Sequence, residues 1–148
     1  MKSKIFTLGY EKKNINEFIS ILIKSDVKIL IDVRETAWSY KRDFCKSNFT
    51  NALNDKGITY LHVKKAGNPK NIRRLQTSMK ERLKIYKNYL KQTQSGIEDI
   101  ESIILAASLD KENICITCFE KEHTDCHRSV IVEFLKDSIT NLEIRHLV

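Results

Sequence analysis

The sequence predicts an α/β fold, with a mostly parallel, open sheet of about five strands flanked by helices. The segment Lys28–Val33 is almost continuously apolar, which is typical of a parallel strand covered on both faces. Strand-length segments alternate along the chain with segments whose apolar residues recur at helical spacing. The 148 residues contain no internal repeat, low-complexity tract or linker, so we expect a single domain over residues 1–148.

The first strand and the first helix have recognisable boundaries. Ile5–Leu8 is predicted to be a strand that Gly9 ends. Asn14 can cap the free N–H groups of the next helix, and Glu17 three residues later can complete a capping box. One face of this helix is expected to be core because its apolar residues follow helical spacing: Ile15, Phe18, Ile19, Leu22 and Ile23.

A second strand and a third strand are predicted on either side of a loop and a short helix. Lys28–Val33 is the second strand, and Arg34–Lys46 is a polar loop after it. Ser47 is expected to cap the short helix, which Gly57 terminates because glycine readily adopts the left-handed conformation that ends helices. Ile58–Val63 is the third strand.

The second half of the chain begins with an irregular segment, Lys64–Thr77, which is longer than most loops between a strand and a helix. After it we expect helices at Ser78–Gln92 and Ile97–Ser108 separated by Ser95-Gly96, a strand at Asn113–Cys118, a helix at Cys126–Lys136 and a strand at Leu142–Val148. With right-handed crossovers, this order gives a Rossmann-like sheet between two helical layers.

Composition excludes some classes of protein. No apolar run approaches the roughly 20 residues that span a bilayer, so no membrane association is expected. The N-terminus leads directly into a strand pattern without a signal-peptide core. Four cysteines without a signal sequence indicate reduced thiols and a cytoplasmic location.

Positive charge is concentrated in one part of the chain, the segment Lys64–Lys91. It contains ten Lys or Arg residues and one acid, Glu81, a local net charge of +9 against +7 for the whole chain. Such a basic patch could follow the phosphate backbone of a nucleic acid. The alternative is a solvated helix face with no partner.

Reactive and charged side chains follow the ends of the predicted strands. In open parallel sheets the ligand crevice lies beyond the carboxyl ends of the strands, so we expect these side chains to share one site. They are Gly9 and Tyr10 after the first strand, Asp32 and Arg34 at the second, His62 and Gly67 after the third, and Cys118 and Glu120 after the fourth.

Two of these positions have a structural alternative. Asp32 interrupts an apolar strand, and a buried carboxylate requires partners. Arg34, two residues on, faces the same side, so Asp32 either orients Arg34 or a substrate hydroxyl, or forms a fixed pair that ties the strand to its loop. His62 is either a base or a core histidine with satisfied hydrogen bonds.

The segment from Cys118 to Ser129 contains two thiols, two imidazoles, three carboxylates and a guanidinium. Cys126, at a predicted helix start near Arg128, meets the conditions for a lowered thiol pKa and is a candidate nucleophile that His127 or His62 would activate. Arg128 at the same helix start is a natural receptor for a phosphate or carboxylate group.

The cysteines allow further interpretations. Cys115 and Cys118 are three apart on a strand and should point to opposite faces, with Cys115 in the core and Cys118 toward the site. Cys118 and Cys126 could form a reversible disulfide, or bind zinc together with Glu120, His123 and His127. Their spacing is not that of a standard zinc signature, so no metal is assigned.

The chain resembles the domain of unknown function 488 family. The resemblance implies an α/β domain whose motifs gather at one site, and it implies no particular reaction. The residues that carry it are Thr7-Leu-Gly-Tyr10, Ile31-Asp-Val-Arg34, Tyr60-Leu-His62, Gly67, Cys118-Phe-Glu120 and Cys126-His127-Arg128-Ser129, in this order along nearly the whole chain.

A weaker resemblance is to rhodanese sulfurtransferases, through Ile31-Asp-Val-Arg-Glu35 and a later cysteine before Arg128-Ser129. In that family one cysteine begins a short loop that closes on the Arg-Ser pair. Cys118 lies ten residues before Arg128 and Cys126 only two, so either loop has the wrong length to cradle a bound sulfur.

We expect an enzyme, or a domain descended from one, that acts on a phosphate-bearing ligand such as a nucleotide or nucleic acid. Arg34 and Arg128 would hold the anion, while Tyr10 and Trp38 could stack a base or sugar. The candidates for catalysis are Asp32, His62, Glu120 and Cys126, and those for ligand binding are Gly9, Tyr10, Arg34, Gly67, Cys118, His127, Arg128 and Ser129.

Two other functions stay open at this point. One is a non-catalytic nucleic-acid-binding module that uses the basic patch Lys64–Lys91. The other is a thiol-based or metal-based regulator that uses Cys118 and Cys126. The sequence identifies neither the reaction, a cofactor nor the oligomeric state.

Overall fold

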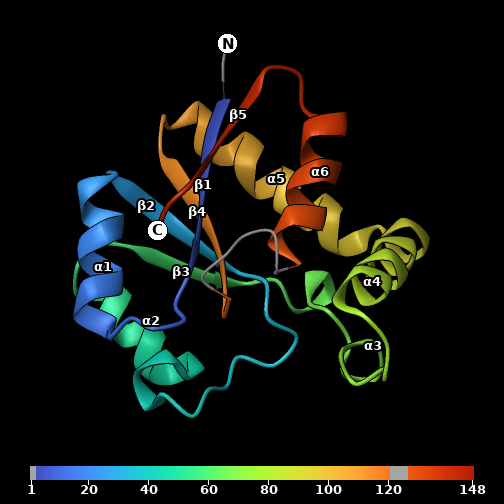
Figure 1. Ribbon diagram of the computed structural model, residues 1–148. Helices are drawn as coiled ribbons and strands as arrows, with labels where there is room; N and C mark the ends of the chain where they lie inside the picture. Colours follow the sequence, from blue (N-terminus) through green and yellow to red (C-terminus); the bar gives the residue numbers. More distant parts are fainter. Residues whose placement is uncertain (1–2, 121–126) are drawn as a thin grey trace.

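The computed structural model describes residues 3–120 and 127–148 of the chain. Five strands form one sheet in which all the described pairings are parallel. Helices cover both faces of this sheet (Figure 1). The α/β fold class predicted from the sequence is therefore confirmed.

The order of the strands places β4 at the centre of the sheet. Across the sheet the order is β3-β2-β4-β1-β5, so β3 and β5 are the edges. The central β4 coincides in its bounds with the strand predicted from the sequence. The strands are β1 (Ser3–Gly9), β2 (Val27–Asp32), β3 (Thr59–His62), β4 (Asn113–Cys118) and β5 (Leu142–His146).

The connections divide into two groups, one for each face of the sheet. The chain moves from β1 to β2 to β3 in one direction, with α1 (Ile15–Lys24) and α2 (Lys46–Asn54) on one face. It then returns to β4 and β5, and the opposite face carries α4 (Met79–Thr93), α5 (Ser95–Leu109) and α6 (Arg128–Ser138). Right-handed crossovers produce this pattern, because reversing the direction also reverses the face.

Alternate strand residues form two separate cores. Ile31 and Ile116 pack in the cluster beneath α4, α5 and α6, whereas Leu30 and Cys115 pack in the cluster with α1 and α2. Because both faces of the sheet are covered, the central strands are apolar along most of their length. The buried polar residues of these strands include Thr7 and Thr117, and the charged Asp32 is fully buried at the end of β2.

The capping box at the start of α1 is present, since the Asn14 side chain accepts from the Glu17 backbone N–H and the Glu17 side chain accepts from the Asn14 N–H. Ile23 was expected in the core, and this was wrong: its side chain is 51 % exposed. Ile23 lies one residue before the end of α1, and the buried residues of the helix are Phe18, Ile19 and Leu22.

The predicted cap of α2 was also wrong. Cys45, not Ser47, is the N-cap, because the Cys45 carbonyl accepts the first helical hydrogen bond from Phe49 N–H. Gly57 adopts a φ of 74° in the turn after the helix, as its expected role requires.

The segment Lys64–Thr77 was expected to be irregular, but it contains a 3₁₀ turn, η2 (Lys64–Ala66), and the short helix α3 (Lys70–Arg73). The break between α4 and α5 falls at Gln94, which has a φ of 52°, and not at Ser95-Gly96. Gly96 instead lies in the first turn of α5, where a Cβ atom would come within 2.6 Å of the Ala66 backbone nitrogen.

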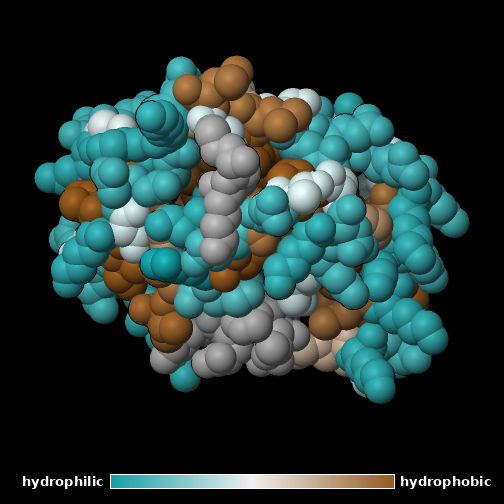
Figure 2. Space-filling model, turned by 90° about the horizontal axis from the view of Figure 1, so that it is seen from above, coloured by the Kyte–Doolittle hydropathy of each residue, from teal (hydrophilic) through white to brown (hydrophobic). Residues whose placement is uncertain are grey.

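The surface on the side of α4 is mostly hydrophilic (Figure 2). This agrees with the exposure of most of the lysines in the basic patch Lys64–Lys91. Among the described residues, no helix has the length and apolar character that crossing a bilayer requires.

Candidate functional site

A cavity of about 680 Å³ lies beyond the carboxyl ends of β1, β2 and β4. The neighbours β1 and β4 continue toward opposite helical layers, α1 on one side and α6 on the other. Divergent connections of this kind open a crevice at the topological switch point of a parallel sheet. The cavity therefore occupies the position that the strand order dictates for a ligand.

A buried ion pair forms the floor of the cavity. Arg34 Nε lies 2.9 Å from Asp32 Oδ1 and Arg34 Nη2 lies 2.7 Å from Asp32 Oδ2, with Asp32 fully buried and Arg34 7 % exposed. Asp32 also accepts hydrogen bonds from the Arg34 backbone N–H at 3.1 Å and from the Tyr60 hydroxyl at 2.5 Å. Asp32 is the acceptor in each of these hydrogen bonds. Because most of them come from Arg34, Asp32 fixes the position of the Arg34 side chain.

The pKa values of this network follow from burial and charge. Burial opposes the charge on Arg34, but the hydrogen bonds and the charge of Asp32 outweigh it and raise the Arg34 pKa. Burial, followed by the charge of Asp32, raises the pKa of Tyr60. Arg34 therefore stays protonated and Tyr60 stays a hydrogen-bond donor at neutral pH.

Arg34 retains donor capacity toward the cavity. A guanidinium has five N–H groups, and in the described residues Nε and Nη2 bond Asp32 while Nη1 donates to the Tyr10 hydroxyl at 3.3 Å. One N–H on each Nη atom is left for a ligand. Tyr10, which stacks on Phe44 at 4.5 Å, also lies under the guanidinium, whose Cζ is 5.3 Å from the Tyr10 ring centre.

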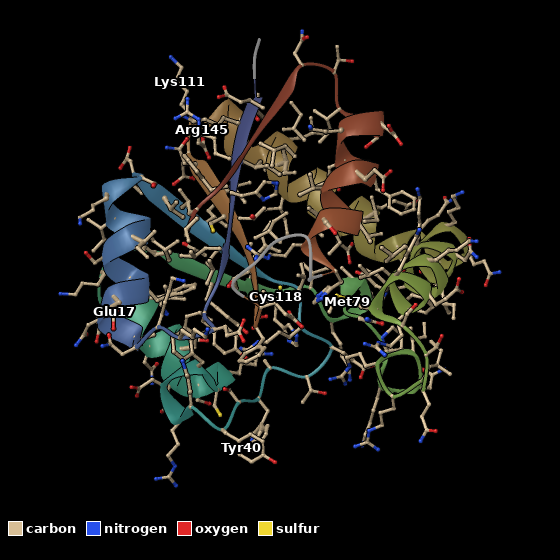
Figure 3. The ribbon with its side chains drawn as sticks, in the orientation of Figure 1. Glu17, Tyr40, Met79, Lys111, Cys118 and Arg145 are labelled. Carbon is tan, nitrogen blue, oxygen red and sulfur yellow. The ribbon has the colours of Figure 1, made fainter. Side chains whose placement is uncertain are left out.

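Aromatic side chains line the outer wall. Trp38 and Tyr40 follow β2 and pack edge to face at 4.7 Å, yet they are 56 % and 93 % exposed. Phe119 follows β4 and is 44 % exposed. Tyr40 extends from the loop at the carboxyl edge of the sheet, and Met79 lies at the start of α4 (Figure 3). The cavity lining thus includes large apolar side chains that are exposed to solvent: Trp38, Tyr40, Met79 and Phe119.

Three further cations line the cavity besides Arg34. Lys41 donates to the Tyr10 and Lys13 carbonyl oxygens at 3.3 and 2.8 Å. Arg73 on α3 pairs with Glu35 at 3.2 Å, and Arg82 on α4 donates to carbonyl oxygens of the preceding loop. Against these four cations the described lining residues supply two carboxylates, Glu35 and Glu120, and Asp32 beneath the cavity pairs with Arg34. Cationic groups therefore outnumber carboxylates by one among the described residues.

His127 and Glu120 contribute titratable groups. His127 is the N-cap residue of α6, and its Nε2 donates to the Val33 carbonyl oxygen at 2.8 Å. Burial lowers the pKa of His127 to about 4, with the hydrogen bond to Val33 acting against it and Arg128 adding to it. His127 is therefore a neutral imidazole at physiological pH. Glu120, half-buried, lines the same cavity.

Arg128 is fully buried and does not line the cavity. It donates to the Thr7 hydroxyl at 3.1 Å and to the Glu120 carbonyl oxygen at 2.8 Å, contacts that fix the chain after β4 against β1. The anion-binding role expected of Arg128 thus gains no support from its position. Its neighbour Ser129 lies in the first turn of α6.

His62 is not among the residues that line the cavity. It lines a separate hollow with Lys64 and Asp99, and its Nε2 donates to the Arg34 carbonyl oxygen at 2.6 Å. That hydrogen bond supports the structural alternative for His62, since it holds the loop that carries Arg34.

Two glycines and one cysteine complete the predicted set. A Cβ on Gly67 would lie 2.3 Å from the Glu35 backbone nitrogen, so Gly67 permits this close approach at the cavity wall. Gly9 pairs with Cys118 in the sheet, directly before Tyr10. Cys126, the candidate nucleophile, lies outside the described residues, as does His123.

The cysteines of β4 point to opposite faces, as strand geometry predicts. Cys115 is a free thiol in the core with α1 and α2, and its burial raises its pKa above the ordinary range. Cys118 packs on the other face, is fully buried and is disulfide-bonded. The other described cysteine, Cys45, is free.

Several cavity residues were not predicted from the sequence. Arg73 and Arg82 were assigned only to the basic patch Lys64–Lys91, and Asn68 and Phe119 were assigned no role. The one available signal was the length of the segment Lys64–Thr77, because long loops in compact domains often serve function. Phe119 is the middle residue of the motif Cys118-Phe-Glu120, but the motif gave no reason to assign it a role.

Comparison with known families gives one match. The family described as "Domain of unknown function DUF488" matches residues 14–135. No curated protein and no solved structure matches the chain. The matched range contains every cavity residue except Tyr10.

Proposed function

Because this chain belongs to the domain of unknown function 488 family, whose description names no reaction, we propose a function from its cavity. The cavity binds a phosphate-bearing ligand with a planar base, either a nucleotide or one nucleotide of a nucleic acid, and acts on it. The observation that carries this proposal is the presence of exposed aromatic rings and excess cationic side chains in one cavity of about 680 Å³. This volume falls in the range of small-molecule sites.

The aromatic wall suits a base. Trp38, Tyr40 and Phe119 line the cavity with exposed rings. A ligand that covers these rings removes apolar surface from water, which favours binding. Stacking of a nucleic-acid base on an aromatic side chain contributes about 1–3 kcal/mol. Asn68 lines the cavity, and its buried Oδ1 has no hydrogen-bond partner among the described residues. A base N–H group would satisfy this acceptor.

The cations suit a phosphate. Arg34 presents two N–H donors on a guanidinium that Asp32 and Tyr10 hold in place, so little side-chain entropy is lost when an anion binds. Arg73 and Arg82 line the cavity from α3 and α4. Planar guanidinium groups bind phosphate oxygens through paired, charge-assisted hydrogen bonds.

For the chemistry, the candidates among the cavity-lining residues are Glu120 and His127. A neutral His127 can accept a proton, and Glu120 can act as a general acid or base. Asp32 acts through Arg34 as a positioning residue. Cys126 keeps its place in the proposal as a candidate nucleophile, on the sequence argument alone.

The single tryptophan of the chain, Trp38, provides the test. We expect adenosine monophosphate to quench Trp38 fluorescence in a saturable way, and ribose 5-phosphate, which has no base, to bind at least tenfold more weakly. Arg73→Gln should weaken nucleotide binding about tenfold, which corresponds to one lost charge-assisted hydrogen-bonding group. Lys111→Gln is the matched control, since Lys111 lies at the other end of the sheet (Figure 3).

Absence of saturable quenching by any nucleotide or short oligonucleotide would refute the proposal. If binding occurs, mass spectrometry of the ligand after incubation tests for turnover. Loss of turnover in Glu120→Gln with retained binding would support catalysis in the cavity. Binding without turnover of any tested ligand would reduce the proposal to a binding function.

A second candidate function is nucleic-acid binding along α4, and one observation favours it. Four lysines of the basic patch recur at intervals of four, three and four residues, which places them on one face of the helix: Lys80, Lys84, Lys87 and Lys91. Lys87 pairs with Glu133 of α6 at 3.3 Å, whereas the other three are exposed. Because α4 also lines the cavity, a bound strand could follow this lysine row away from a base held in the cavity.

A further inference from the structure

A sulfur, a carboxylate oxygen and an imidazole nitrogen lie close together between β4 and α6. Cys118, Glu120 and His127 each supply one such atom, and the three atoms are within 4.8 Å of one another. Cys118 Sγ is 3.5 Å from Glu120 Oε2. Glu120 and His127 also line the cavity, whereas Cys118 lies behind them in the core.

The distance between Cys118 Sγ and Glu120 Oε2 matches the edge of a tetrahedral metal site. A thiolate sulfur at about 2.3 Å and a carboxylate oxygen at about 2.0 Å from Zn²⁺ are about 3.5 Å apart when the angle at the metal is tetrahedral. The observed separation of Cys118 Sγ and Glu120 Oε2 has this value. The third atom, at up to 4.8 Å, needs a displacement of only about an ångström.

The surroundings of His127 are those of a metal ligand. Its Nε2 donates to the Val33 carbonyl oxygen at 2.8 Å. Metal-binding imidazoles almost always donate their second N–H to a carbonyl or carboxylate in this way, which fixes the ring orientation and the tautomer.

We propose that the reduced protein binds one thiophilic divalent cation, of the zinc class, through Cys118, Glu120 and His127. Three protein ligands leave a fourth coordination position, as in catalytic zinc sites. The inference does not depend on the nucleotide proposal, because it follows from the three ligand atoms alone.

The disulfide bond of Cys118 makes this site dependent on redox state. A sulfur in a disulfide has no thiolate to offer. Exchange with a dithiol reductant transfers two electrons and two protons to the disulfide, yields two protein thiols and leaves the reductant as a disulfide. The Cys118 thiol then loses its proton as the metal binds. The reverse exchange, with a small disulfide as oxidant, removes the ligand and releases the metal.

Co²⁺ replaces Zn²⁺ as a spectroscopic probe. The protein is reduced with a phosphine, the phosphine is removed without air, and Co²⁺ is added. We expect one equivalent to bind with a near-ultraviolet thiolate-to-cobalt band and visible bands of tetrahedral intensity. The oxidised protein should show neither. Cys118→Ser should lose the near-ultraviolet band, and Glu120→Gln should bind Co²⁺ at least tenfold more weakly.

Cys45→Ser is the matched control, because Cys45 is a free, half-buried thiol outside this cluster, and it should bind Co²⁺ as the wild type does. Glu120→Gln alters a half-buried side chain outside any helix or strand, so its result stands even if Cys118→Ser fails to fold. The proposal is overturned if the reduced wild type gives no thiolate band. It is also overturned if Glu120→Gln binds Co²⁺ with unchanged affinity, or if the oxidised protein binds it equally well.

Discussion

Asp32 and Arg34 place opposite charges almost completely out of water next to the cavity. The sequence indicated that a carboxylate in an apolar strand must have partners, and Arg34 two residues on was one of the two partners proposed. It did not indicate the Tyr60 hydroxyl, which reaches Asp32 from β3. Contacts between neighbouring residues follow from strand geometry, whereas contacts between strands require the strand order.

Asp32→Asn should be strongly destabilising, because the Arg34 guanidinium would stay buried without its counter-charge. We expect the free energy of unfolding in urea to fall by about 3–5 kcal/mol. The double variant Asp32→Asn/Arg34→Met should lose less than the single variant. Asp26→Asn, which breaks the exposed pair of Asp26 with Lys28, should change stability by less than about 1 kcal/mol. A loss below 1 kcal/mol for Asp32→Asn would contradict the buried-pair interpretation.

His127 should make stability depend on pH. The unfolded chain takes up a proton at His127 near pH 6.5, whereas the folded protein holds this imidazole neutral until about pH 4. The unfolded state therefore binds more protons between these values, so stability falls as the pH drops from about 6.5 to about 4, by up to about 3 kcal/mol. His127→Gln should remove this part of the pH dependence of urea unfolding. If His127→Gln shows the same pH dependence of stability as the wild type, other groups must cause that dependence.

The elements were largely predictable because their periodicities are local. The capping box of α1 and the bounds of β4 agree with the sequence prediction. The errors occur where tertiary packing decides, as at Gly96, whose missing side chain admits the backbone of η2. Helices as short as α3 have too little periodicity to be detected in a sequence, and this helix carries Arg73 into the cavity.

Gly67→Ala should perturb binding through the segment η2–α3. Its new Cβ would lie 2.3 Å from the backbone of Glu35, so the two loops must separate at the cavity wall. We expect a loss of about 1–3 kcal/mol in stability and at least tenfold weaker nucleotide binding. Gly57→Ala is the control: it has a φ of 74° and no atom within 4 Å, so it should lose stability from backbone strain and bind normally. If Gly67→Ala binds nucleotide with unchanged affinity, the contact between Gly67 and Glu35 does not shape the cavity.

The lysine row of α4 can be tested by its effect on salt dependence. If it contacts a single-stranded nucleic acid, Lys80→Gln/Lys84→Gln should reduce the slope of log K against log salt by about 1.4, since each phosphate contact contributes about 0.7. Mobility shift or fluorescence anisotropy at several salt concentrations measures this slope. Lys24→Gln/Lys56→Gln removes the same charge from the α1 and α2 side. Equal slopes for the two double variants would refute a role for α4.

At the scale of the whole molecule, the fold class was predictable, but the strand order was not. The expected site at the carboxyl ends of the strands stays a prediction, although a cavity lies there. Periodicity identifies a parallel sheet covered on both faces, and many orders of five strands share that pattern. The order β3-β2-β4-β1-β5 decides which loops meet, and it separates His62 from the cavity while bringing Phe119 into it. It also buries Arg128 against Thr7, more than a hundred residues away.

The strand order also predicts the pattern of hydrogen exchange. The amides of β4 are bonded between β2 and β1, so they should exchange only through extensive unfolding. The amides of the edge strands β3 and β5 should exchange faster through local opening. Native-state exchange followed by mass spectrometry or NMR would measure both. Slower exchange in β5 than in β4 would contradict the order of strands described above.

The walls of the cavity come from segments that follow strands, while its floor rests on the sheet. Sequence changes in the segment 35–41 or in α3 can therefore alter which ligand fits, with little cost to the buried strands that hold the fold together. Such a division favours evolvability: new specificities can be sampled on an unchanged framework. It also makes the protein a suitable host for loop grafting, in which the segment 35–41 is exchanged and selected for new ligands.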